Sequence, residues 1–241
     1  MKELMGMINL DKPAGMSSAR AVDRVKRLLP RGTKIGHAGT LDPFATGVLL
    51  LLIGKATKLC EKLMDQPKQY EATMKLGATT ATDDPESPEQ PYGGLGVSPE
   101  QRELGRDAQA TLENIRSVLR RFIGAIQQRP PAFSAMKVAG RRAYDLARGG
   151  QPLELEPRTI NVYAIDLLEF AWPLLRLRID CGRGTYIRSI ARDLGEALGV
   201  GGYLTQLRRT RVGEFRIENS VTPEKLLADG AAAHLLPASA H

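Results

Sequence analysis

The chain reads KIGHAGTLDPFATG over residues 34–47 and continues as the apolar run VLLLLI over residues 48–53, which Gly54 ends. An apolar run of this length between glycines is typical of a strand that is buried on both faces. The residues before the run therefore form a loop that a rigid strand carries. A loop of this kind can hold a side chain in a fixed position.

Asp42 is the acidic residue of this loop. Gly36, Gly39 and Gly47 allow backbone conformations or close approaches that a Cβ atom would prevent, and Pro43 fixes φ directly after the acid. Asp42 is thus presented on a stiff turn, as a catalytic carboxylate would be. An Asp-Pro pair also favours a turn by itself, so on this stretch alone a simple turn-capping role is an equal alternative.

Length and charge limit the class of protein. The 241 residues favour one large domain, or one domain with an insertion. The 34 lysines and arginines exceed the 27 acids, which gives a net charge of +7, and the pI near 9.5 favours a polyanionic partner. Cys60 and Cys181 belong to no CxxC pattern, which argues against a zinc ribbon or a disulfide framework.

Targeting signals are not evident in the sequence. The first residues lack the apolar region of a signal peptide, and the longest apolar run is too short to span a bilayer. We therefore expect a cytoplasmic protein without membrane contact.

Periodicity predicts alternating helices and strands. Helices are expected after Ser17-Ser18 up to Pro30, over residues 55–64 and from Thr111 to Gly124, and strands over residues 70–76, 158–170 and 174–181. Residues 78–110 are rich in proline and glycine and predict a loop or insertion. We expect one catalytic domain over residues 1–220, followed by a short tail over 221–241 that forms no separate domain.

Arg188 is a second candidate residue. A Gly-x-Gly turn follows the strand that ends at Cys181 and passes into a helix with Ile187 and Ile190 on its apolar side. Arg188 and Arg192 share the polar side at i and i+4. A strand, a glycine turn and a helix start in this order can bring Arg188 to the end of a sheet, where it is a plausible partner for a carboxylate.

The densest basic neighbourhood is formed by Lys137, Arg141, Arg142 and Arg148, with the aromatic residues Phe133 and Tyr144 among them or close by. Basic side chains with interleaved rings suit contacts with phosphates and bases.

Four blocks together resemble the TruB family, whose members are tRNA pseudouridine-55 synthases. The blocks are LDKPAGMSS at 10–18, KIGHAGTLDP at 34–43, PPAFSAMK at 130–137 and GTYIR at 184–188, and the resemblance spans about residues 6–217 in the family's order. The resemblance implies an α+β fold with a mixed, largely antiparallel sheet flanked by helices. It also implies a central basic active-site cleft for RNA, and neither a metal nor an organic cofactor.

The resemblance further implies roles for individual residues. Asp42 matches the catalytic aspartate, Tyr70 the tyrosine that stacks on the target base, and Arg188 the arginine that pairs with the catalytic carboxylate. Five further residues match positions that line the substrate: Lys12, His37, Asp84, Tyr186 and Leu207. Among these, His37 resembles the residue that fills the base stack when the target uridine leaves it, and Asp84 an acid near the arginine.

The implied reaction is the isomerisation of uridine 55 in the T-loop of tRNA. The aspartate attacks the ribose at C1′ or assists formation of a glycal, and the released uracil turns and rejoins the sugar through C5. A carboxylate in a dry pocket stays ionised beside an opposite charge, which an arginine supplies. Flipping out the nucleotide costs a few kcal/mol, of which stacking recovers about 1–3 kcal/mol per base.

Two features depart from the family pattern. Ala81 stands where the family usually has the aspartate of a Thr-Asp-Thr sequence, and only 26 residues (216–241) follow Phe215, whereas bacterial members usually continue into a C-terminal RNA-binding domain. The leading hypothesis is a monomeric, stand-alone enzyme that binds the T-stem-loop of tRNA. The alternatives are a guide-dependent enzyme for ribosomal RNA and a non-catalytic module that binds or folds tRNA.

Overall fold

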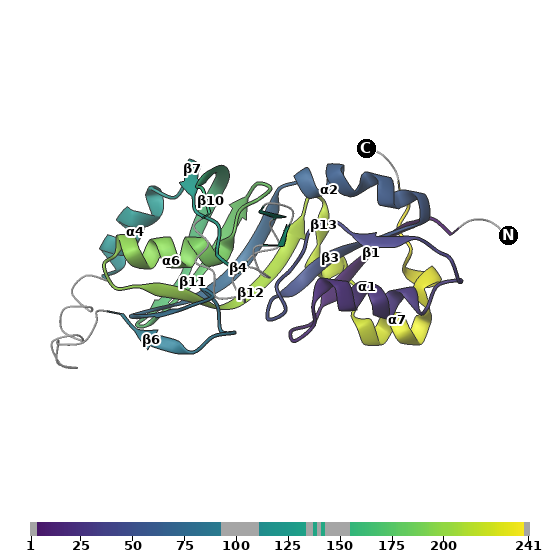
Figure 1. Cartoon of the computed structure of the whole chain (residues 1–241), viewed down its shortest axis with the longest axis horizontal. Helices are drawn as coiled ribbons and strands as arrows, with labels where there is room; N and C mark the ends of the chain where they lie inside the picture. Colours follow the sequence, from purple (N-terminus) through teal and green to yellow (C-terminus); the bar gives the residue numbers. More distant parts are fainter. Residues whose placement is uncertain (1–3, 93–110, 134–136, 139–140, 143–154, 239–241) are drawn as a thin grey trace. The chain divides into compact units, whose positions relative to one another are not determined.

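The computed structural model describes residues 4–92, 111–133, 137–138, 141–142 and 155–238 (Figure 1). The chain divides into two compact units. The first unit consists of Met1–Glu71 and Leu207–His241, and the second of Ala72–Gln206. Strands β4 (Lys68–Leu76) and β12 (Gly202–Val212) contribute residues to both units.

The first unit is built around β3 (Thr46–Ile53). Its other elements are β1 (Gly6–Lys12), α1 (Ser18–Lys26), β2 (Ile35–His37), the 3₁₀ helix Gly54–Leu59, α2 (Cys60–Asp65), β13 (Phe215–Arg216), the 3₁₀ helix Ile217–Asn219, α7 (Pro223–Asp229) and the 3₁₀ helix Ala231–His234. β1 and β2 pair with β3 in antiparallel fashion, and β12 pairs with β3 in parallel, with Arg209 opposite Gly47. β13 then pairs with the end of β12.

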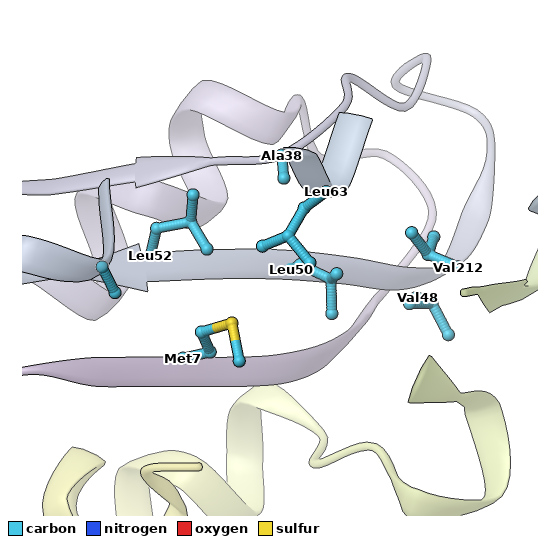
Figure 2. Packing of buried hydrophobic residues seen from close by; sticks show 8 residues of the cluster. Met7, Ala38, Val48, Leu50, Leu52, Leu63 and Val212 are labelled. Carbon is cyan, nitrogen blue, oxygen red and sulfur yellow. The ribbon is translucent and has the colours of Figure 1, made fainter. Parts of the chain in front are cut away.

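Strand β3 is buried on both faces, as its apolar run predicts. Val48, Leu50 and Leu52 pack with Leu63 of α2 in one cluster, to which Ala38, Met7 and Val212 also belong (Figure 2). The alternate residues of the strand, including Leu49 and Leu51, are fully buried on the other face. Figure 1 shows α2 on one side of β1 and β3, and α1 and α7 on the other. This sandwich gives the loop before β3 a rigid support.

The second unit contains the rest of the sheet. Its elements are β5 (Ala78–Thr80), β6 (Glu89–Pro91), α4 (Leu112–Arg120), β7 (Gly124–Gln128), β8 (Lys137–Val138), β9 (Arg141–Arg142), β10 (Arg158–Ala171), β11 (Leu174–Cys181) and α6 (Ile187–Ala197). The strand order in this unit is β12-β4-β11-β10-β7, and the β10–β11 and β10–β7 pairs are antiparallel. Helices α4 and α6 contact each other. The predicted α+β class with a mixed, largely antiparallel sheet is confirmed.

Several element boundaries differ from the sequence prediction. The helix expected to run from Thr111 to Gly124 ends at Arg120, because Phe122 turns back to the carbonyl of Leu119 and Gly124 opens β7 with a φ of +102°. The helix expected over residues 55–64 is a 3₁₀ helix followed by the short α2. In the segment predicted to be a loop over 78–110, β5 and β6 form a hairpin, and residues 93–110 lie outside the described residues.

The expected tail over 221–241 is tied to the first strand of the chain. The amide of Val221 donates to the carbonyl of Asn9, and Leu236 exchanges two backbone hydrogen bonds with Met7. α7 lies between these two contacts. The predicted organisation into one catalytic domain over residues 1–220 and a tail stays a prediction.

No helix among the described residues combines the length and apolar character needed to cross a membrane.

Candidate active site

Asp42 lies half-buried in the loop that joins β2 to β3. The amide of Ala45 donates to the carbonyl of Asp42 at 3.1 Å and closes a turn around the acid. The amide of Gly15 donates to the carbonyl of Pro43 at 2.9 Å. The backbone on the C-terminal side of Asp42 is therefore held both by its own turn and by the segment that follows β1.

Two buried side chains hold the same loop. Ser18, at the start of α1, accepts from the amide of Leu41 at 2.9 Å and donates to the carbonyl of the same residue at 3.0 Å. The ammonium of Lys12 donates to the carbonyls of Met16 at 2.6 Å, Pro13 at 2.9 Å and Pro43 at 3.3 Å. The residues directly before and after Asp42 are thus both fixed.

Lys12 also places a charge next to the acid. Its side chain is fully buried, and burial lowers the pKa of Lys12 to about 8, whereas the Asp42 carboxylate raises the pKa and Arg209 lowers it further. At pH 7 the amine therefore remains mainly protonated. A fixed ammonium favours the ionised form of the neighbouring carboxylate.

His37 stands at the end of β2, where the loop begins. Burial lowers the pKa of His37 below its usual 6.5, and the nearby Arg209 guanidinium lowers it further. The ring is therefore mainly neutral at pH 7. Its Nδ1 atom is buried and has no hydrogen-bond partner among the described residues, so this atom is a candidate contact for a ligand.

Tyr70 and Leu207 complete the set of predicted residues in the first unit. Tyr70 is 8% exposed and lies on the buried face of β4, where the alternation of buried and half-buried residues follows the predicted pattern. Leu207 of β12 is 7% exposed, and its carbonyl accepts from the hydroxyl of Thr46 at 3.5 Å.

Arg188 and Asp84 form a buried ion pair in the second unit. The Nη1 atom of Arg188 lies 2.9 Å from the carboxylate of Asp84, and the two side chains are 5% and 2% exposed. Nη1 also donates to the carbonyl of Thr82, and Nη2 donates to that of Phe133. The expected closeness of Asp84 to this arginine is confirmed. Arg188 is buried within α6, although the sequence placed it on the polar side of the helix.

The start of α6 is fixed by a buried amide side chain. Gln128 of β7 accepts from the amide of Tyr186 at 2.9 Å and donates to its carbonyl at 3.0 Å. One turn beyond Arg188, Arg192 pairs with Asp83 at 2.9 Å and donates to the carbonyl of Arg129. Asp83 has a φ of +58°, and burial raises its pKa to about 6 against the opposing charge of Arg192.

The eight predicted residues thus fall into two groups. Lys12, His37, Asp42, Tyr70 and Leu207 belong to the first unit, and Asp84, Tyr186 and Arg188 to the second. Contacts join Lys12 to the Asp42 loop and Arg188 to Asp84. The predicted pairing of Arg188 with Asp42 stays a prediction. Much of the predicted basic neighbourhood and part of the block at 130–137 lie outside the described residues, since 134–136, 139–140 and 143–154 are not described.

Sequence reasoning missed three residues that shape these groups: Ser18 as a loop contact, Gln128 and Arg209. For Ser18, the sequence indicates only that it lies just before the expected helix. Arg209 is 1% exposed and shares the buried face of β12 with Leu207, two residues before it. That period-2 spacing is the only sequence signal for its burial. For Gln128, no pattern in the sequence indicates its role.

Metal chemistry has no evident ligand set here. Among the described residues, no group of three or more His, Cys, Asp or Glu side chains is placed to hold a metal ion.

Comparison with known proteins gives matches over nearly the whole chain. The model for the TruB family pseudouridylate synthase N-terminal domain matches residues 26–187, and that for the tRNA pseudouridylate synthase B C-terminal domain matches residues 188–237. A tRNA pseudouridine synthase B of Dechloromonas aromatica is 45% identical over 99% of this chain and 76% of its own length. A tRNA pseudouridine synthase B of Burkholderia mallei is 43% identical, again over 99% of this chain and 76% of its own length.

Solved structures give a consistent picture of the fold. A chain in the crystal structure of a Cbf5–Nop10–Gar1 complex matches 92% of this chain with a TM-score of 0.67 and 34% identity. A chain in an H/ACA RNP bound to a substrate RNA containing 2′-deoxyuridine matches the same share with a TM-score of 0.63 and 32% identity. This chain spans about half the length of those two chains, at 54% and 52%. On the family models and the curated relatives, the chain belongs to the TruB family of pseudouridylate synthases.

Proposed function

We propose that this protein converts uridine to pseudouridine in tRNA, and that its target is position 55 in the T-loop. The observation that carries the proposal is the loop around Asp42, in which buried Lys12 and Ser18 fix the residues on both sides of a half-buried carboxylate. A nucleophile needs such a fixed position, because small displacements of a reacting group reduce the rate strongly.

In the proposed reaction the carboxylate of Asp42 attacks C1′ of the flipped-out nucleotide or assists formation of a glycal. Uracil is released, turns and rejoins the ribose through C5, so the reaction is an isomerisation with no net change of atoms. Tyr70 offers a ring for stacking of the base and takes part in removal of the C5 proton. Arg188 supplies the positive charge that balances the catalytic carboxylate, and Tyr186 and Leu207 line the substrate.

His37 is proposed to hold the place of the flipped-out base. A ring that is mainly neutral at pH 7 suits this role, because it stacks on bases without carrying its own charge into the stack. Its buried Nδ1 has no partner among the described residues. Depending on the tautomer, this atom can accept a hydrogen bond from the nucleotide or donate one to it.

A basic cavity in the first unit supports binding of a polyanion. The cavity has a volume of about 560 Å³, and its lining includes Arg31, Lys34, Lys55 and Lys58. Four cations around one cavity suit the phosphates of an RNA backbone. Together with the net charge of +7, the cavity gives the protein a means of holding tRNA. We propose that the protein acts in this way as a cytoplasmic monomer on the T-stem-loop.

The relatives favour tRNA over the guide-dependent alternative. The curated relatives named tRNA pseudouridine synthase B are 42–45% identical, and this chain spans 73–76% of their length. The chains in the Cbf5 and H/ACA complexes are 32–34% identical, and this chain spans only about half of them.

The test is to map pseudouridine in an unmodified tRNA transcript after incubation with the purified protein, without a guide RNA. We expect modification at the T-loop uridine alone, and none in a transcript in which that uridine is replaced by cytidine. Modification at another position would reject the substrate assignment, and a requirement for a guide RNA would favour the alternative enzyme.

A further inference from the structure

Arg209 is a buried arginine whose partners are uncharged. It is 1% exposed, and its guanidinium donates to the carbonyls of Val48 at 2.7 Å, Gly39 at 3.0 Å and Thr40 at 3.4 Å. Within the described residues no carboxylate lies within ion-pair distance of this guanidinium. A buried cation is costly, and an apolar side chain of similar volume often serves stability as well or better.

Two of the three acceptors, Gly39 and Thr40, lie in the loop that carries Asp42, and the third, Val48, lies in β3 just after that loop. Gly39 and Thr40 precede the acid by three and two residues, and Val48 follows it by six. The guanidinium of an arginine holds its donors in a rigid planar fork, whereas the donors of a lysine ammonium rotate on a flexible stem. Arg209 therefore ties the first part of the loop to β3, whereas Ser18 and Lys12 hold its centre.

The backbone of Arg209 is itself fixed against the loop. In the parallel pairing of β12 with β3, Arg209 lies opposite Gly47. A Cβ atom at Gly47 would lie 2.2 Å from the carbonyl oxygen of Arg209, so only a glycine permits this approach. The backbone that carries the guanidinium is therefore held in a fixed position relative to the end of the loop.

We propose that Arg209 is a positioning residue for the catalytic loop, and that it sets the placement of Asp42 without touching the substrate. This inference rests on the proposed function of Asp42. Arg209 also lies close enough to His37 and Lys12 to lower the pKa of both, so its charge is felt at the start of the loop and at the residue that holds its centre.

The test compares Arg209→Lys and Arg209→Met with Arg211→Lys and Arg211→Met. Arg211 is the matched control, since it lies two residues further along β12 and donates to the carbonyl of Gly213, outside the loop. The full-length variants are measured for folded fraction by circular dichroism, for tRNA affinity, and for the single-turnover rate of pseudouridine formation with saturating enzyme.

For the Arg209 variants we expect a rate per folded molecule about ten to a hundred times below wild type, because a small displacement of a catalytic group has this effect. We expect tRNA affinity within about threefold of wild type, since the guanidinium is buried. The lysine variant keeps the charge but not the fork, and should remain slow. The Arg211 variants should keep the wild-type single-turnover rate.

An NMR titration of the His37 ring gives a readout that needs no activity. Loss of the positive charge in Arg209→Met should raise the pKa of His37, and Arg211→Met should leave it unchanged. An inactive wild type would reject the proposed function itself. An active wild type with fully active folded Arg209 variants, or with Arg209 variants that all fail to fold, would overturn the positioning role alone.

Discussion

Arg188 forms the most deeply buried of the described ion pairs of the second unit, with Asp84. Its guanidinium is almost fully buried and shares its donors between the carboxylate of Asp84 and two backbone carbonyls. Thr82 in turn donates to the carboxylate of Asp84 and also contacts the hydroxyl of Ser87. A buried ion pair of this kind contributes little net free energy to stability. Removal of one partner is nevertheless costly, because the other charge stays buried with less compensation.

Asp84→Asn should therefore destabilise the second unit by about 3–5 kcal/mol, because it removes the carboxylate that lies 2.9 Å from the buried Arg188 guanidinium. The only tryptophan of the chain, Trp172, lies in this unit and reports its unfolding in urea by fluorescence. Glu169→Gln is the matched control, since Glu169 and Arg176 form an exposed pair with side chains 60% and 48% exposed. It should cost less than about 1 kcal/mol. Equal effects of the two substitutions would contradict the account.

Asp83 makes a pH-dependent contribution to stability. Burial raises its pKa from 3.8 to about 6, so between these pH values the folded protein binds more protons than the unfolded chain. The contribution is fully present below pH 3.8 and is lost as the pH rises through 6. The stability of wild type relative to Asp83→Asn should thus fall between pH 4 and 6.5.

Asp83→Asn should add no backbone strain, because asparagine tolerates the φ of +58° at this position. Urea unfolding followed by Trp172 fluorescence at several pH values measures the difference. A pH-independent difference for Asp83→Asn would mean that Asp83 is already ionised at pH 4.

Single residues differ in how far the sequence reveals them. The turn around Asp42 was predictable, because glycines, a proline and a buried strand surround it within a few residues, and the structure shows that turn before β3. The burial of Arg188 and Arg209 was not, since a charged residue in a helix or strand is normally solvent-exposed. Their acceptors are carbonyls and an acid far away in the sequence, and no local pattern encodes such partners.

At the scale of elements, the close contact between β3 and β12 depends on Gly47. Its φ is +104°, and an added Cβ would lie 2.2 Å from the oxygen and 2.8 Å from the nitrogen of Arg209. Gly124 has nearly the same φ of +102°, but a Cβ there would meet no atom within 4 Å. Alanine substitutions at these two glycines therefore distinguish the cost of backbone strain, which both share, from the cost of steric overlap, which only Gly47 has.

Gly124→Ala should cost about 1–2 kcal/mol through strain alone. Gly47→Ala should cost more, about 2–5 kcal/mol, because β3 and β12 must also move apart. Chemical denaturation followed by far-ultraviolet circular dichroism measures both. Similar values for the two variants would show that the strands tolerate a side chain at Gly47.

Strands were easier to predict than helix ends in this chain. The strand expected over 174–181 has these bounds in the structure, because its alternation of apolar and charged residues is unbroken, and the run at 48–53 lies in β3 as expected. The helix after Thr111 was predicted too long, since Phe122 and Ile123 continue the apolar spacing although the chain already turns towards β7. The end of the helix is set by the pairing of β7 with β10, and the local spacing of apolar residues carries no information about that pairing.

At the scale of the whole molecule, the sequence blocks at 10–18 and 34–43 lie together and hold one loop. Lys12 and Ser18 from residues 10–18 bind the carbonyls of Pro43 and Leu41 from residues 34–43. The sequence showed that the two blocks occur together, but only the fold shows why. One block supplies the carboxylate, and the other holds the backbone around it.

We propose that Asp42 is the catalytic group and not a turn cap. The most direct measurement is the single-turnover rate of pseudouridine formation in an unmodified tRNA transcript, for wild type and Asp42→Asn, with tRNA affinity determined in parallel. Asparagine keeps the shape of the turn but cannot attack the sugar. We predict no detectable pseudouridine with Asp42→Asn and tRNA affinity within about threefold of wild type, since the backbone contacts of the loop remain. Pseudouridine formation by Asp42→Asn at the wild-type rate would contradict the claim.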